Sequence, residues 1–99
     1  MSDMNTRELL IKLKELKPAL MAQFKVKEIN LFGSFVREEQ SESSDIDILV
    51  EFEEEADLFD LMGLSMQLEE ELQRKVDVVP KRALRSELRE SVLQEVIEV

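Results

Sequence analysis

The sequence predicts a small α/β protein in which a mixed sheet is packed by helices. Three observations support this fold class. Leucines recur at helical spacing near the N-terminus, short β-rich apolar segments alternate with helical ones, and no repeat or linker interrupts the order αβ(α)βαβα. A chain of 99 residues with 43% apolar residues can bury a modest core, so we expect a single domain over residues 1–99.

The first helix is expected at about residues 6–22. Asn5 followed by Glu8 forms an approximate capping box, and leucines follow at helical spacing. Pro18 lies inside this pattern and is expected to kink or restart the helix, because proline removes a backbone donor. A strand is expected at 26–32.

A Gly-Ser pair ends this strand, and a short helix is expected at about 34–39, followed by a polar loop. The next strand is expected at 45–52. It is apolar on both faces apart from two aspartates, which is typical of an interior strand.

Asp57 is expected to cap a third helix, where Gly63 indicates close packing against the sheet. We expect the buried side of this helix to comprise Leu58, Leu61, Met62, Ser65, Leu68 and Leu72.

A third long strand is expected at 75–79, stopped by Pro80. The last helix is expected at about 85–98, with Leu88, Val92 and Val96 on one face.

The composition excludes several kinds of chemistry. The chain has no Cys and no His, which removes thiol nucleophiles, the commonest general base and the commonest transition-metal ligand. Carboxylates remain as the available catalytic and metal-binding groups, and oxygen ligands favour hard cations such as Mg²⁺. The polar N-terminus lacks signal-peptide features and no apolar run could span a bilayer, so we expect a cytoplasmic protein without a membrane partner.

The net charge of −10 bears on partners. It argues against direct nucleic-acid binding, because phosphate backbones would be repelled, and it favours a basic protein partner. Simple solubility explains the charge equally well, and the acidic run near residues 51–57 fits a solvated loop.

Three aspartates carry the candidate chemistry. Asp45 and Asp47 project to the same side of one strand, because alternate residues of a strand share a face. Asp77 lies on another strand and could meet them. Three converging carboxylates would repel one another unless cations neutralise them, and two Mg²⁺ ions about 4 Å apart would provide the two-metal arrangement for displacement at phosphorus. Asp77 is then placed to accept a proton. The alternative is that these aspartates lie at strand ends and simply face water. The occurrence of all three within apolar strands disfavours that alternative.

Gly33, Ser34 and Arg37 form the second part of the candidate site. Gly33 permits close backbone approach, and Ser34 offers a hydroxyl and an amide at a helix start, where anions are favoured. Arg37 lies on the same face of that short helix and could reach a phosphate. Taken alone, the Gly33-Ser34 pair could be only a tight strand-to-helix corner. Arg37 alone could be an ordinary surface cation.

Together these residues resemble the minimal nucleotidyltransferase (MNT) family, which has the DNA polymerase β-like nucleotidyltransferase fold. The pattern is Gly33-Ser34-x-x-Arg37, then Ser44-Asp45-x-Asp47, then Val76-Asp77-Val78. The similarity covers the chain from Leu9 to about Val96. The resemblance implies that Gly33 and Ser34 hold the triphosphate of ATP, and that the three aspartates bind metal.

The resemblance also implies a partner. Many MNT proteins are antitoxins of HEPN-domain ribonuclease toxins, and members of the family transfer AMP from ATP to a tyrosine of the toxin. This chain departs from the family at Glu38, where glycine is usual. We therefore expect a Mg²⁺-dependent protein adenylyltransferase that silences a HEPN toxin. The alternatives are an acidic antitoxin that acts by binding alone, and a nucleotidyltransferase that modifies a small molecule.

Overall fold

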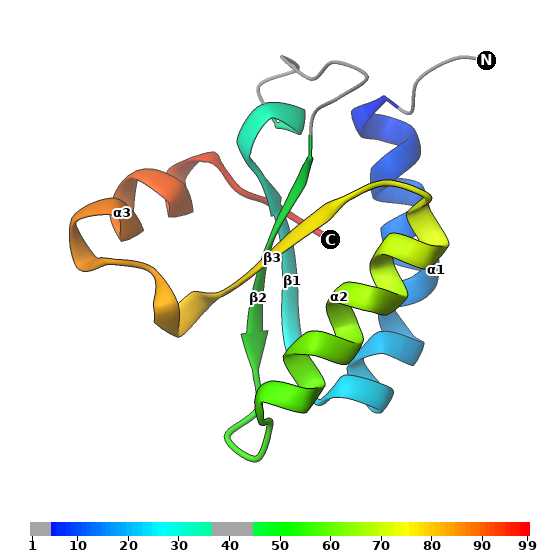
Figure 1. Cartoon of the computed structure of the whole chain (residues 1–99). Coiled ribbons are helices and arrows are strands. Elements are labelled where there is room, and N and C mark those ends of the chain that lie inside the picture. The colour runs from blue at the N-terminus through cyan, green and yellow to red at the C-terminus, as the bar shows by residue number, and fades with distance from the viewer. Residues whose placement is uncertain (1–4, 37–44) are drawn as a thin grey trace.

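The computed structural model describes residues 5–36 and 45–99 and shows a four-stranded sheet covered by helices (Figure 1). The elements are α1 (Thr6–Phe24), β1 (Val26–Phe32), a 3₁₀ turn (Gly33–Phe35), β2 (Ile46–Phe52), α2 (Leu58–Leu72), β3 (Val76–Pro80), a second 3₁₀ turn (Lys81–Ala83), α3 (Ser86–Glu95) and β4 (Ile97–Glu98). The strand order is β3-β2-β1-β4. The predicted fold class and order of elements are confirmed, with one added strand.

The sheet is mixed. β1 pairs antiparallel with β2 and with β4, and β3 runs parallel to β2. The interior position predicted for β2 is confirmed, because it lies between β1 and β3. Helices α1 and α2 cover one face of the sheet, and α3 lies on the other side (Figure 1).

The core lies between the sheet and α1 and α2. Ile46, Ile48 and Val50 of β2 point into it, with Ile29 and Leu31 of β1. All five side chains are fully buried. The alternate residues of β2, starting with Asp47, therefore point to the other face, where the candidate chemistry lies.

Helix α1 begins where the sequence predicts. The Asn5 side chain accepts a hydrogen bond from the backbone N–H of Glu8 at 2.8 Å and so caps the helix. Pro18 lies inside α1 without ending it, and the helix continues to Phe24, two residues beyond the predicted end. Lys25 then adopts a left-handed conformation with φ of 57° that closes the helix.

Helix α2 begins at the predicted cap but buries a different side. Asp57 and Asp60 form a reciprocal capping box. The buried residues of α2 are Leu64, Leu68 and Leu72, whereas Leu58 and Met62, predicted to be buried, are exposed. The prediction was wrong here because α2 is apolar on two sides, and spacing alone cannot tell which side meets the core.

Gly63 packs against a helix and not against the sheet. A β carbon at this position would lie 2.6 Å from Cε1 and 3.2 Å from Cδ1 of Phe24 in α1. The close packing that the sequence indicates is therefore present, but its partner is α1.

The C-terminal segment differs from the prediction. α3 ends at Glu95, and the chain turns back to form β4, which pairs with β1. The backbone N–H of Val99 donates to the carbonyl of Ile29 at 3.0 Å, and Val99 is buried. None of the side chains of α3 is buried. Within the described ranges, no helix is long and apolar enough to cross a membrane.

Candidate active site

The candidate site is built around the turn that follows β1. Gly33 is buried and adopts a positive φ of 79°, a conformation that residues with a β carbon rarely adopt. The N–H of Val36 donates to the Gly33 carbonyl at 3.1 Å and closes one 3₁₀ turn over Gly33–Phe35. The short helix expected at about 34–39 is thus seen as this turn, and residues 37–39 lie outside the described part of the chain.

Asp47 of β2 lies directly against Gly33. A β carbon on Gly33 would lie 3.0 Å from Cγ of Asp47 and nearer still to its Oδ2. The contact follows from strand pairing, because Asp47 lies opposite Phe32, the residue before Gly33. A side chain at position 33 would therefore collide with the carboxylate, so this position requires glycine for two separate reasons.

The parallel pairing of β2 and β3 brings a second carboxylate alongside. Asp47 and Asp77 occupy matching positions of the two strands, so their side chains start from neighbouring points on one face of the sheet. Asp77 is exposed and Asp47 is half-buried. The register thus places Asp77 beside Asp47 on the neighbouring strand, and their joint role in one site stays a prediction.

Asp45 is placed less closely. It immediately precedes β2 and is exposed, two residues before Asp47 and therefore on the same side of the chain. Across residues 5–36 and 45–99, no three acidic side chains converge closely enough to hold a metal ion by themselves.

The donor set nevertheless fits Mg²⁺. The three candidate residues offer only carboxylate oxygens, which hard cations prefer. Mg²⁺ commonly uses one or two carboxylates and completes its coordination with water and with phosphates of the substrate. The neighbouring Asp47 and Asp77 meet that requirement without a third protein ligand.

Two predicted binding residues are not described in full. Arg37 lies outside the described residues, as do Glu38 and Ser44. Ser34 is the second residue of the 3₁₀ turn, and its side chain is not among the groups that the structure describes. Their assignment to phosphate binding stays a prediction.

Arg74, which lies outside the sequence motifs, is close to the same turn. Its guanidinium carbon lies 5.2 Å from the ring centroid of Phe35, the last residue of the turn. The carbonyl of the next residue, Lys75, accepts a hydrogen bond from the N–H of Ile46 at 3.0 Å. Arg74 lies three positions before Asp77 and belongs to no motif, so only the pairing of β3 with β2 reveals its place beside the turn.

The far end of this sheet face carries a charged network. Lys81 Nζ lies 3.7 Å from Glu28 Oε2 and 3.5 Å from Glu51 Oε1, and Lys27 Nζ lies 3.8 Å from Glu51 Oε2. Burial acts to raise the pKa of Glu51, but the hydrogen bond with Glu28 and the ammonium groups of Lys81 and Lys27 outweigh it and lower that pKa. Glu51 lies four residues from Asp47, about 13 Å along the strand, so the network is separate from the candidate site.

Comparison with known proteins also points to a nucleotidyltransferase. Residues 13–99 match the nucleotidyltransferase domain family. The protein adenylyltransferase MntA of Thermococcus cleftensis is 46% identical over 83 residues, which is 84% of this chain and 84% of that protein. A solved structure described as a minimal nucleotidyltransferase superposes with a TM-score of 0.87 at 37% identity, covering all of both chains.

A third match is a complex of a tri-AMPylated Shewanella oneidensis HEPN toxin with an MNT antitoxin. The TM-score is 0.63 at 27% identity, over 91% of this chain and 69% of that one. The sheet, the glycine turn and these matches define the class: the protein is a nucleotidyltransferase. Within that class, the chain belongs to the nucleotidyltransferase domain family and has the fold of its minimal members. The resemblance inferred from the sequence is confirmed.

Proposed function

We propose that this protein is an antitoxin that transfers AMP from ATP to a tyrosine of a HEPN-domain toxin. The observation that carries the proposal is the meeting of three separate segments: Gly33 after β1, Asp47 in β2 and Asp77 in β3. A glycine turn beside two neighbouring carboxylates is suited to chemistry on a nucleoside triphosphate.

In this proposal Asp45, Asp47 and Asp77 hold two Mg²⁺ ions. Bound Mg²⁺ neutralises charge on the triphosphate and makes an attacking hydroxyl more acidic. Because Gly33 has no side chain, the phosphates can approach the backbone of the turn closely beside Asp47. Ser34 and Arg37 would make further contacts with the phosphates. Asp77 is exposed, which suits its carboxylate to accept the proton of the tyrosine hydroxyl.

The reaction is a group transfer at the α-phosphorus of ATP. A bond forms between the tyrosine oxygen and this phosphorus, the bond from the phosphorus to the bridging oxygen of the β-phosphate breaks, and pyrophosphate leaves. The proton of the tyrosine hydroxyl passes to Asp77. The chain supplies position and charge stabilisation, and no covalent enzyme intermediate is needed.

The relatives support the choice of acceptor. One is a protein adenylyltransferase, and another was solved as an MNT antitoxin with an AMPylated HEPN toxin. A docked protein that brings its own hydroxyl to Asp77 is the arrangement these observations favour.

Intact-mass spectrometry tests the proposal. The purified chain is incubated with ATP, Mg²⁺ and the HEPN-domain protein of the same organism, and we expect one or more AMP units on the HEPN protein. An Asp45→Asn/Asp47→Asn variant should yield no adduct, whereas Glu15→Gln, which alters an exposed carboxylate of α1, should act like the wild type. An unmodified HEPN protein after incubation with the wild type would contradict the proposal.

A second candidate is neutralisation by binding alone. It is favoured by the uneven charge: residues 51–73 contain nine acidic residues and no Lys or Arg, so a basic toxin could be masked without chemistry. Protection of cells by a variant with Asp45, Asp47 and Asp77 all changed to Asn would support this candidate. Loss of protection with the complex still intact would exclude it.

A further inference from the structure

Helix α2 carries an exposed apolar stripe that the core does not use. Phe59 is 81% exposed, Met66 68%, Leu58 66% and Met62 53%. Their positions place all four on one side of the helix, about 12 Å long from Leu58 to Met66. A surface helix normally turns such residues inward, so a continuous exposed stripe indicates a contact surface.

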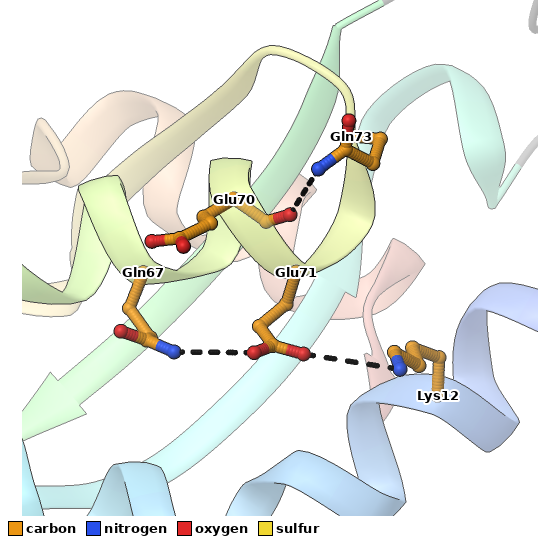
Figure 2. Close-up of polar contacts among 5 residues, drawn as sticks. All are labelled: Lys12, Gln67, Glu70, Glu71 and Gln73. Atoms are coloured by element: carbon orange, nitrogen blue, oxygen red, sulfur yellow. Dashed lines mark hydrogen bonds and ion pairs between the residues drawn. The ribbon is translucent and has the colours of Figure 1, made fainter.

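The other sides of α2 are already engaged. Leu64 and Leu68 face the core, and Gly63 packs on Phe24 of α1. Figure 2 shows the polar contacts near the C-terminal end: Lys12 of α1 lies 3.9 Å from Glu71, which accepts a hydrogen bond from Gln67 at 3.3 Å. The orientation of α2 is therefore fixed by α1 and the sheet, and the stripe is held facing outward.

The stripe borders a groove at the edge of the sheet that carries Asp77. The groove has a volume of about 330 Å³ and lies between α2 and the edge strand β3. It is lined by Leu61, Met62, Ser65, Met66, Val76, Asp77 and Val78. Asp77, the proposed proton acceptor, is among the lining residues, although alternate residues of β3 face opposite sides and Val76 and Val78 are the ones that face α2. A segment that fills the groove would lie along the edge strand that carries Asp77.

The charge around the stripe indicates which kind of partner can bind there. The stripe and both its flanks lie within residues 51–73, which contain nine carboxylates and no Lys or Arg. Lysines of other segments pair with three of these carboxylates, Glu51, Asp60 and Glu71. Glu54 and Glu55 precede it, and Glu69 and Glu70 follow it. A second copy of the same surface would be repelled, whereas Lys or Arg side chains around an apolar segment would be attracted.

We infer that the α2 stripe and the groove beside β3 form the docking site for the acceptor protein, which presents an apolar segment flanked by Lys or Arg. The inference rests on the proposed function for the role of the docked protein. Docking here places the acceptor along β3, the edge strand that carries Asp77, so that its tyrosine can reach the carboxylates around that edge while the apolar contact holds the acceptor.

Binding measurements test the surface. Titration calorimetry with the HEPN-domain protein of the same organism compares wild type with Met62→Gln/Met66→Gln. We expect the dissociation constant to rise at least tenfold. The matched control is Ile11→Gln/Leu88→Gln, which alters apolar residues on α1 and α3 that are 52% and 51% exposed, and it should bind like the wild type. Circular dichroism verifies that each variant is folded.

The charged flank has its own test. Glu54→Gln/Glu70→Gln should weaken binding severalfold at low salt and differ little from wild type at 0.5 M NaCl, because screening removes the same attraction. A dissociation constant that changes neither with the two substitutions nor with salt would contradict the proposal that the partner carries Lys or Arg at this surface.

Transfer of AMP, measured on the same samples, separates the two proposals. If the stripe variant binds and modifies the HEPN protein like the wild type, the docking site is wrong and the proposed function stands. If the wild type binds through the stripe but adds no AMP, the docking site stands and the transferase activity is wrong. Analytical ultracentrifugation tests whether a second copy of the chain binds the stripe instead. The inference would be overturned if the chain self-associates and the stripe substitutions abolish that self-association.

Discussion

The carboxylate of Asp47 lies against the α carbon of Gly33, and no side chain fits between them. The contact joins the first strand, the turn after it and the second strand at one point. It explains why the turn needs glycine, and it sets the position of the carboxylate with respect to the proposed phosphate site. Two predictions test contacts of this kind directly.

Gly33→Ala should both strain the backbone and push Asp47 away. The positive φ costs about 1–3 kcal/mol for a residue other than glycine, and the collision adds to it. Urea denaturation measures the loss of stability. In an Asp47→Ala background the same substitution should cost less, because only the backbone strain remains. Equal losses in both backgrounds would show that the contact does not exist.

Gly63→Ala should destabilise the protein, although alanine normally favours a helix over glycine by about 1 kcal/mol. The new methyl group would collide with the ring of Phe24, and such overpacking costs about 1–3 kcal/mol. The thermal midpoint should therefore fall. In a Phe24→Leu background, where the ring is gone, the same change should cost less or stabilise. A rise of the midpoint in the wild-type background would contradict the packing of α2 on α1.

The return of the chain as β4 predicts a specific loss at the C-terminal end. Val99 is buried among core residues, so Val99→Ala should cost about 1–2 kcal/mol of unfolding free energy. Glu98→Ala changes the neighbouring exposed residue and should cost less than 0.5 kcal/mol, a usual value for surface positions (about ±0.5 kcal/mol). Equal effects in urea titrations would mean that β4 is not packed as described.

The charge network at Glu51 predicts a pH dependence. The pKa of Glu51 is lowered in the folded protein, so this carboxylate stabilises the fold above its unfolded pKa. That contribution is lost as the pH falls through the folded pKa. Lys81→Met removes an ammonium that lowers this pKa, so the loss of stability between pH 7 and pH 3 should be smaller in the variant. The effect is small because Glu51 is partly exposed, and it should vanish at 1 M NaCl.

Local signals made the fold predictable over much of its length. β1 runs over the predicted residues, and the caps at Asn5 and Asp57 are in place, since each depends on a few neighbouring residues. The wrong predictions concern long-range choices. Spacing could not show that Leu58 and Met62 face outward, because the contact with α1 decides which side of α2 is buried. Nor could it show β4, whose partner β1 lies far away in the sequence.

The sequence predicted the members of the candidate site, whose roles stay predictions, but it could not predict how they are arranged. The pattern of glycine and three aspartates indicated a nucleotidyltransferase, and the family match confirms it. The register of β2 and β3 sets Asp47 beside Asp77 and leaves Asp45 at the strand start. Arg74, beside the same turn, carried no motif and became visible only when β3 was placed next to β2.

The central claim is that Asp47 and Asp77 act together in the transfer of AMP to a partner protein. The most direct measurement is the intact mass of the HEPN-domain protein after incubation with ATP, Mg²⁺ and either the wild type or Asp77→Asn. The account predicts AMP adducts with the wild type and a rate at least a hundredfold lower with Asp77→Asn, which removes the proton acceptor while the complex still forms. Equal adduct formation by both proteins, or none by the wild type, would contradict it.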